Sequence, residues 1–156
     1  MAIASRAPDD SAEKAYIACI RLLGRREYSK AELYRKLKLR FTSEAARQAV
    51  IRASGEGAQS DERFAEMLVR HGISNCLGPL RLRLEARKRG FDPDALDPYM
   101  EGADFHAAAL DFLRRRYSVA DTSDYKLRQK MKAALYRRGF DPETCAEACE
   151  QFSRSG

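Results

Sequence analysis

The chain has 156 residues, of which 44% are hydrophobic, and carries a formal net charge of +6 at pH 7, a length that suits one domain or several small ones. Its apolar runs are shorter than the ~18 residues of a membrane helix, and no signal-peptide core is visible, so we expect a cytoplasmic protein without a membrane partner. No long alternation of Val, Ile and Thr occurs, which argues against strands and predicts an all-α fold.

The first predicted module holds three helices. Ser11 is expected to cap the first, because its hydroxyl can accept a hydrogen bond from a free amide of the first turn. Ser29 and Glu32 have the spacing of a capping box and predict the start of the second helix. A third helix is predicted over residues 43–54, and the glycines that follow end the module.

The second predicted module opens at Ser60, where the next two acidic residues suit the positive end of a helix dipole. Four side chains share one face of this helix: Phe64, Met67, Leu68 and His71. Pro79 opens the second helix, in which Leu80 and Leu84 are expected to point inward. A short third helix is predicted over residues 93–100.

The third predicted module begins near Ala103, and three arginines at residues 114–116 close its first helix. Residues 121–123 are candidate caps for the next helix, and Pro142 starts the last one. The residues expected to face inward in the last helix are Cys145, Ala146, Cys149 and Phe152. The predicted division is a flexible tail over 1–10, modules over 11–57, 58–101 and 102–152, and a flexible tail over 153–156.

One short sequence occurs twice and supports this modular division. Arg-Gly-Phe-Asp-Pro-Asp at residues 89–94 returns at residues 138–143 with Glu in the last place. Each copy predicts a helix end at a left-handed glycine, a buried phenylalanine, and an Asp-Pro helix start. A degenerate copy at residues 40–44 keeps the phenylalanine and a capping hydroxyl. Such a period is typical of tandem structural units.

Motifs for catalysis and metal binding are missing from the sequence. It holds neither a phosphate-binding glycine loop nor a nucleophile elbow, and its two histidines stand apart. The cysteines form no C-x-x-C pair, which favours buried thiols in a reducing compartment: Cys19, Cys76, Cys145 and Cys149. We therefore expect a protein that is not an enzyme and has no cofactor or metal.

Positive charge is concentrated in the second helix of each module and the turns beside it. Residues 11–55 carry 11 Lys and Arg against 4 Asp and Glu, so the first module is the most basic. Similarly stacked modules would form a discontinuous track along phosphates; solvated helix faces would give the same pattern. The candidate binding residues are Arg25, Arg26, Lys30, Arg35, Lys36, Lys38, Arg40, Arg81, Arg83, Arg87, Lys88, Arg89, Lys126, Arg128, Lys130, Lys132 and Arg137.

From about residue 12 to residue 152 the chain resembles the RecX family, which regulates the bacterial recombinase RecA. The stretches that carry the resemblance are Leu22-Leu23 with Arg25-Arg26, Ser29–Leu33, Lys36-Leu37, Ser60–Ala65, Gly78–Leu82 with Glu85, Arg89–Phe91 and Arg137–Phe140. The sequence departs from the family at Ala86, where leucine is usual, and at Cys76-Leu77, where a more polar turn is common.

The resemblance implies an elongated, curved array of three three-helix modules. It implies a monomer that lies in the groove of a RecA filament on single-stranded DNA. There it would inhibit ATP hydrolysis and strand exchange and limit filament growth or favour disassembly, and so modulate recombination, DNA repair and the SOS response. On this reading the second-helix cations contact RecA or DNA, and the first module contributes most.

Two other functions fit a basic three-helix repeat. A duplex-DNA-binding transcription regulator would place a third helix in the major groove. The third helices over residues 93–100 and 142–150 are acidic and hold no Lys or Arg, which disfavours this role. A protein-binding adaptor without nucleic-acid contact is the other alternative, and binding to DNA-free RecA would favour it.

Overall fold

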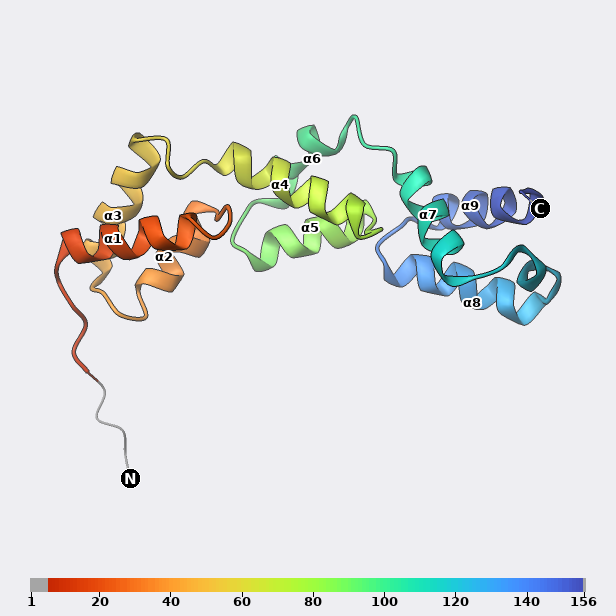
Figure 1. The fold of residues 1–156 in the computed structure, drawn as a ribbon, viewed down its shortest axis with the longest axis horizontal. Coiled ribbons are helices and arrows are strands. Elements are labelled where there is room, and N and C mark those ends of the chain that lie inside the picture. Colours follow the sequence, from red (N-terminus) through yellow and green to blue (C-terminus); the bar gives the residue numbers. More distant parts are fainter. Residues whose placement is uncertain (1–5, 156) are drawn as a thin grey trace, which may run out of the picture. The chain divides into compact units, whose positions relative to one another are not determined.

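The computed structural model describes residues 6–155, and Figure 1 shows helices joined by short turns. The helices are α1 (Ala12–Leu23), α2 (Lys30–Leu37), α3 (Ser43–Gly55), α4 (Asp61–Ser74), α5 (Pro79–Lys88), α6 (Pro93–Met100), α7 (Phe105–Arg116), α8 (Tyr125–Arg137) and α9 (Pro142–Arg154), with a 3-10 helix η1 (Val119–Ser123) before α8. Over residues 6–155 the β pairing is limited to an isolated bridge between Asp9 and Phe41. The all-α prediction is therefore confirmed.

The chain divides into two compact units. Unit 1 contains the described residues up to Ala65 together with Arg89–Phe91, and unit 2 contains Glu66–Lys88 and the described residues from Asp92 onward. The module boundaries at 57/58 and 101/102, and the elongated, curved arrangement, stay predictions. Residues 1–5 and 156, which belong to the predicted tails, lie outside the described residues.

Side-chain caps begin α1 and α2 where the sequence predicts them. The hydroxyls of Ser11 and Ser29 each accept an amide hydrogen bond of 3.1 Å from the first turn that follows. The prediction for α8 is wrong, because residues 121–123 lie in η1, which starts with a capping box at Ser118. Asp124 caps α8 instead and accepts from the amide of Lys126 at 2.8 Å.

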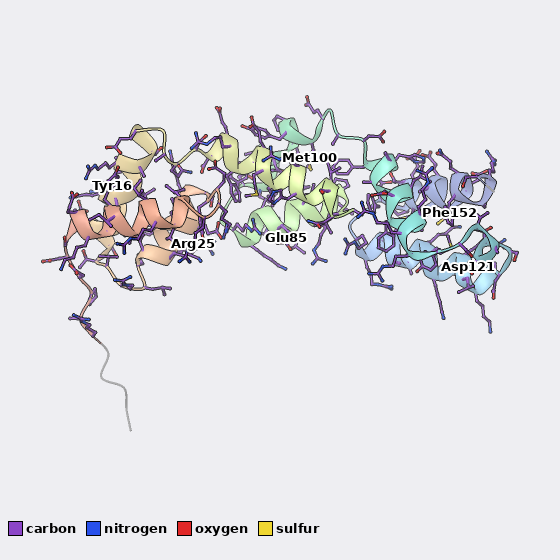
Figure 2. All side chains as sticks on the ribbon, viewed as in Figure 1. Tyr16, Arg25, Glu85, Met100, Asp121 and Phe152 are labelled. Carbon is purple, nitrogen blue, oxygen red and sulfur yellow. The ribbon has the colours of Figure 1, made fainter. Side chains whose placement is uncertain are left out.

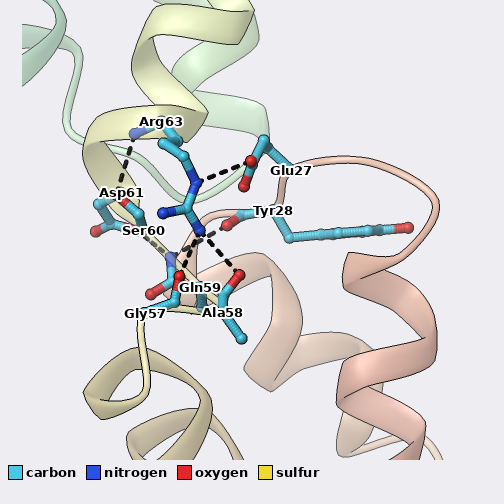
Figure 3. Close-up of polar contacts among 8 residues, drawn as sticks. All are labelled: Glu27, Tyr28, Gly57, Ala58, Gln59, Ser60, Asp61 and Arg63. Atoms are coloured by element: carbon cyan, nitrogen blue, oxygen red, sulfur yellow. Dashed lines mark hydrogen bonds and ion pairs between the residues drawn. The ribbon is translucent and has the colours of Figure 1, made fainter.

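The core of unit 1 lies between α1, α2 and α3. Its buried side chains include Cys19, Leu33, Phe41 and Ala46. Figure 3 shows how the turn after α1 is fastened to the start of α4. The Arg63 guanidinium donates to Glu27 at 3.0 Å and to two backbone carbonyls before α4. The ion pair with Arg63 neutralises the Glu27 carboxylate locally.

In unit 2 the buried face of α5 differs from the predicted one. Leu80 and Leu84 are 51% and 44% exposed, whereas Leu82 and Ala86 are fully buried. The physical reason is a close approach to α4, where Gly72 leaves room for the Leu82 side chain. A Cβ at Gly72 would lie 2.0 Å from Leu82 Cδ2. Leu82 therefore takes the inward position, and the leucines two residues away on either side point outward.

The last helix differs from the prediction in its buried face and in the residue at which it ends. Cys145, Cys149 and Phe152 are buried as predicted, but Ala146 is exposed and Ala148 takes its place in the core. Residues 145, 148, 149 and 152 share one helical face, and residue 146 lies off it. The helix continues to Arg154, two residues past the point where the sequence predicts the tail to begin.

The repeated corner has the predicted backbone. Gly90 and Gly139 have φ of +71° and +97°, and the aspartate two residues after each glycine caps the next helix. Phe140 is fully buried, as predicted. Phe91 is only half-buried and packs on Phe64, with ring centres 5.5 Å apart. The two copies of the repeat therefore share the backbone conformation of the turn, but their phenylalanines are buried to different extents.

Each glycine corner is hydrogen-bonded to residues at the start of a helix that precedes it in the chain. This helix is α2 for the corner at Gly90 and α5 for the corner at Gly139. In unit 1 the Ser29 hydroxyl donates to the carbonyl of Arg89 at 2.7 Å. In unit 2 the amides of Gly78 and Leu80 donate to the carbonyls of Arg138 and Gly139 at 2.8 and 3.0 Å. These contacts make the repeated glycine corner a joint between helices distant in sequence.

Candidate nucleic-acid interface

The predicted binding residues lie on α2, α5 and α8 and on the turns beside them. Those around α2 belong to unit 1, together with Arg89, and the remainder belong to unit 2. A single track through all three helices stays a prediction. Within each unit, some of these cations form ion pairs with acidic side chains or hydrogen bonds with backbone carbonyls, and others form neither.

Arg26 is bound into unit 1. Its guanidinium donates to both carboxylate oxygens of Glu32, at 2.7 and 3.2 Å, and lies 3.7 Å from the centre of the Tyr28 ring. The hydrogen bond that Arg26 donates to Glu32 raises the pKa of Arg26, although desolvation opposes the change. Because this bidentate pair neutralises the guanidinium locally, Arg26 positions the start of α2 rather than attracting a polyanion.

Arg83 has the corresponding structural role in unit 2. It donates to Asp94 at 2.7 Å, pairs with Asp97, and donates to the carbonyl of Pro93 at 3.2 Å. All three partners belong to α6, so Arg83 ties α5 to α6. The sequence alone could not separate it from the other arginines of α5.

Other cations are held more loosely. Arg81 and Lys88 share the carboxylate of Glu85 at 3.4 and 3.8 Å, and exposed pairs of this kind contribute little stability. Arg128 donates to the carbonyl of Thr122 at 2.8 Å. These three side chains keep much of their charge available to a partner.

The remaining predicted cations are mostly exposed. The Arg35 guanidinium lies beside Gly90 in unit 1. The predicted cations without an ion pair in residues 6–155 are Arg25, Lys30, Lys36, Lys38, Arg40, Arg87, Arg89, Lys126, Lys130, Lys132 and Arg137. All of these except Arg89 and Lys132 are exposed. They are the best candidates for contact with an anionic partner.

Several of these unpaired cations meet in a groove between α1 and α2. We call it the basic groove; it has a volume of about 380 Å³ and its cations are Arg21, Arg25, Lys36 and Arg40. Figure 2 labels Arg25, which lies on the turn after α1. Sequence reasoning missed Arg21 because it lies in the first helix, outside the basic second helix. The available signal was the place of Arg21 in the last turn of α1, four residues before Arg25.

Apolar side chains complete the basic groove. Leu22, Leu37, Leu39 and Phe41 line it beside the cations. Leu39 is 84% exposed, whereas Leu37 and Phe41 are buried at its base. The groove thus combines fixed positive charge with apolar surface.

A second hollow of about 500 Å³ adjoins the basic groove at residues 39–41. It adds Arg6 and Lys14 to the cations nearby. Asp9 is its acidic residue; one carboxylate oxygen lies 3.7 Å from Lys14 Nζ and the other accepts from the Ser11 amide at 2.8 Å. Because Lys14 is paired with Asp9, Arg6 is the further cation that this hollow adds beside Arg40.

The four thiols are buried, as the sequence predicts. Burial raises the pKa of Cys19 and of Cys145 to about 11, and desolvation also raises the pKa of Cys76 and of Cys149. A raised pKa keeps each thiol protonated at pH 8, and the thiolate is the reactive form.

We expect a colourimetric disulfide reagent to label the native thiols at pH 8 at least ~100-fold more slowly than those of the protein in guanidinium chloride. The native rate should rise as the pH approaches 11. One thiol that reacts at the unfolded rate would contradict the burial of that cysteine.

Residues 6–155 contain no group of three or more His, Cys, Asp or Glu side chains that could hold a metal ion. None of the helices described here has the length and apolar character needed to cross a membrane.

The helices of residues 6–155 follow one another as three sets of three, an all-α arrangement with cations on the second helix of each set. Three models of the RecX family match in order: the first three-helix domain at residues 15–52, the second at 60–97 and the third at 104–149. The chain belongs to the RecX family, and the resemblance inferred from its sequence is confirmed.

Curated relatives and solved structures agree with this assignment. Regulatory protein RecX of Xanthomonas campestris pv. campestris (strain B100) is 47% identical over 124 residues, which cover 77% of this chain and 76% of that protein. Regulatory protein RecX of Legionella pneumophila (strain Corby) is 33% identical over 145 residues, covering 91% and 97%. RecX from Lactobacillus salivarius shares the fold, with a TM-score of 0.77 at 17% identity over 92% of this chain and 97% of that one.

Proposed function

We propose that the protein binds the RecA filament on single-stranded DNA and inhibits ATP hydrolysis, strand exchange and filament growth. It would thereby modulate recombination, DNA repair and the SOS response as a cytoplasmic monomer without enzymatic activity. The observation that carries this proposal is the ordered match of three RecX domains across residues 15–149. The curated relatives bear the name of a regulatory protein, which supports a regulatory role.

The unpaired cations of α2, α5 and α8 are the proposed contact residues. Exposed Lys and Arg without local acids gain most from phosphates or from acidic groups of a partner, because no existing ion pair must be broken. On this criterion Arg87 and Arg137 are stronger candidates than Arg83, whose charge is paired with α6.

The test is the single-stranded-DNA-dependent ATPase of RecA from the same source, titrated with this protein. We expect the steady-state rate to fall as the protein is added. Inhibition well below one molecule per RecA would indicate blocked filament growth, and inhibition near saturation would indicate occupancy of the filament groove. An unchanged rate together with tight binding to a particular duplex sequence would replace this proposal with the transcriptional one.

Charge reversals locate the contact on α5. Changing Arg81, Arg87 and Lys88 to Glu together should weaken filament binding, but it also strips Glu85 of its two partners. Arg87→Glu alone separates surface charge from those ion pairs. Arg70→Glu is the matched control, because Arg70 is exposed on α4 and has no ion pair in residues 6–155. Equal binding by both single variants would remove Arg87 from the interface.

A further inference from the structure

The segment before α1 is hydrogen-bonded to the corner that follows α2. We call residues 7–10 the strap. The Asp9 amide donates to the carbonyl of Arg40, and the Asp9 carbonyl accepts from the amide of Thr42, each at 2.9 Å. These two bonds form the parallel bridge between Asp9 and Phe41. The strap therefore binds the main chain of the corner in the way that an added strand binds the edge of a sheet.

The bond to Arg40 has a counterpart at each of the other two corners. The carbonyl of Arg89 accepts from the Ser29 hydroxyl at 2.7 Å, and the carbonyl of Arg138 accepts from the Gly78 amide at 2.8 Å. In those two corners the donor lies at the start of α2 or of α5. At the corner after α2 the strap supplies the donor instead. The strap thus takes the place that a helix start holds in the other corners.

The strap is held less firmly than the helices whose place it takes. Leu33 in α2 and Leu82 in α5 are fully buried and anchor those helices. Within the strap, Asp9 is half-buried and the other three residues are exposed. The ion pair of Asp9 with Lys14, at 3.7 Å, is exposed as well, and such pairs add little stability. Segments with few buried contacts open locally while the core stays folded.

The strap lies at the border of the basic groove. Residues 6–9 line the second hollow together with Leu39, Arg40 and Phe41, and these three residues also line the basic groove. Arg40 therefore belongs to both spaces, and Asp9 brings a carboxylate into the hollow beside it. Release of the strap would remove this carboxylate and one wall of the hollow, so that the two spaces would join around Arg40.

We propose that the strap is a releasable cover on the Arg40 end of the basic groove, and that its release offers this end of the groove to the RecA filament. The inference rests on the proposed function, to which it adds a step of regulation. When the binding-competent form of a protein is a minor population, its apparent affinity is reduced by the fraction that is competent. Loosening the strap should therefore strengthen inhibition of the RecA ATPase.

Hydrogen exchange followed by NMR tests the strap in the full-length protein without RecA. The Thr42 amide is bonded to the strap, whereas the Gly78 amide is bonded within the joint of unit 2. We expect the Thr42 amide to be protected from exchange at least ~10-fold less than the Gly78 amide. Equal protection of the two amides would mean that the strap opens no more readily than the joint, and would overturn the proposal.

Two variants of equal net charge isolate the main-chain bond. Asp9→Ala removes the carboxylate, whereas Asp9→Pro removes both the carboxylate and the amide that donates to Arg40. We expect the Thr42 amide to exchange at least ~10-fold faster in Asp9→Pro than in Asp9→Ala. The Ala46 amide, which donates to the Thr42 carbonyl in the first turn of α3, should keep its protection in both variants and so show that unit 1 is folded. Equal exchange of the Thr42 amide in the two variants would contradict a strap held by its main chain.

The RecA ATPase then tests the regulatory step. Asp9→Pro should reach half-inhibition at a protein concentration at least ~3-fold lower than Asp9→Ala does. Equal or weaker inhibition by Asp9→Pro would overturn the strap as a cover, while inhibition by the wild-type protein would keep the proposed function. Absence of inhibition by the wild-type protein would remove the proposed function and the regulatory step together, and the exchange rates would still decide whether the strap is released.

Discussion

Replacing Gly139 with alanine is expected to lower the free energy of unfolding by about 2–5 kcal/mol, the sum of a left-handed backbone cost and a steric one. The residue has φ of +97°, and an added Cβ would lie 2.4 Å from the backbone nitrogen and the Cβ of Arg81. Because a helix backbone cannot move aside as a flexible side chain can, the joint between the corner and the start of α5 must open. Guanidinium denaturation followed by circular dichroism measures the loss.

Gly57→Ala separates the two costs. Gly57 also has a positive φ, of +78°, but an added Cβ would meet nothing within 4 Å. This variant should lose only the left-handed cost of about 1–2 kcal/mol. If Gly57→Ala proved as damaging as Gly139→Ala, the close approach to Arg81 would carry no energetic weight.

Phe140→Ala should destabilise the protein by about 3–5 kcal/mol, because it removes a large side chain from the core and leaves a cavity. Phe140 is fully buried in the cluster formed by α7, α8 and α9. The same denaturation experiment should show a lower midpoint. An unchanged slope with denaturant concentration would indicate that the native state keeps its compactness.

The matched comparison is Phe91→Ala, at the equivalent place in the repeat. Phe91 is half-buried, and its aromatic contact is with Phe64. A loss of about 1–2 kcal/mol is expected from the smaller area that it buries. Equal losses at both positions would mean that the repeat fixes the energy of its phenylalanine as well as the turn.

Most starts and ends of helices could be predicted from the sequence because they depend on local chemistry, and the start of α8 is the exception described above. Ser29, Asp92 and Asp141 cap their helices through hydrogen bonds to amides no more than three residues away. Gly90 and Gly139 end theirs in the left-handed conformation that glycine adopts easily. These signals do not depend on what packs against the helix.

The buried face of α5 could not be predicted in the same way. Residues 80, 82 and 84 are all leucine, and in a helix residues two apart point to different sides. Either side could have been buried. Gly72, ten residues before Leu82, decides between them by admitting its side chain. The identity of the buried leucine therefore depends on a tertiary contact with α4, and the sequence of α5 itself holds no pattern that reveals it.

The sequence predicts which cations belong to the candidate interface, but it does not predict which of them are paired with acids and which are available to a partner. The sequence identified Arg25, Lys36 and Arg40, which share the basic groove, but it gave Arg26 the same rank. Arg26 is neutralised by Glu32, six residues away, through a geometry that needs the turn before α2 to be folded. Separating available charge from paired charge requires the positions of the acids.

The joint in unit 2 makes part of the contact between distant helices independent of side-chain identity. Its hydrogen bonds run between main-chain groups, from the amides of Gly78 and Leu80 to the carbonyls of Arg138 and Gly139. Every residue other than proline carries both groups, so substitutions that spare the two glycines leave the bonding atoms in place. The Arg138 guanidinium adds side-chain hydrogen bonds to the carbonyls of Asn75 and Cys76, which a substitution there would remove while the main-chain bonds stayed.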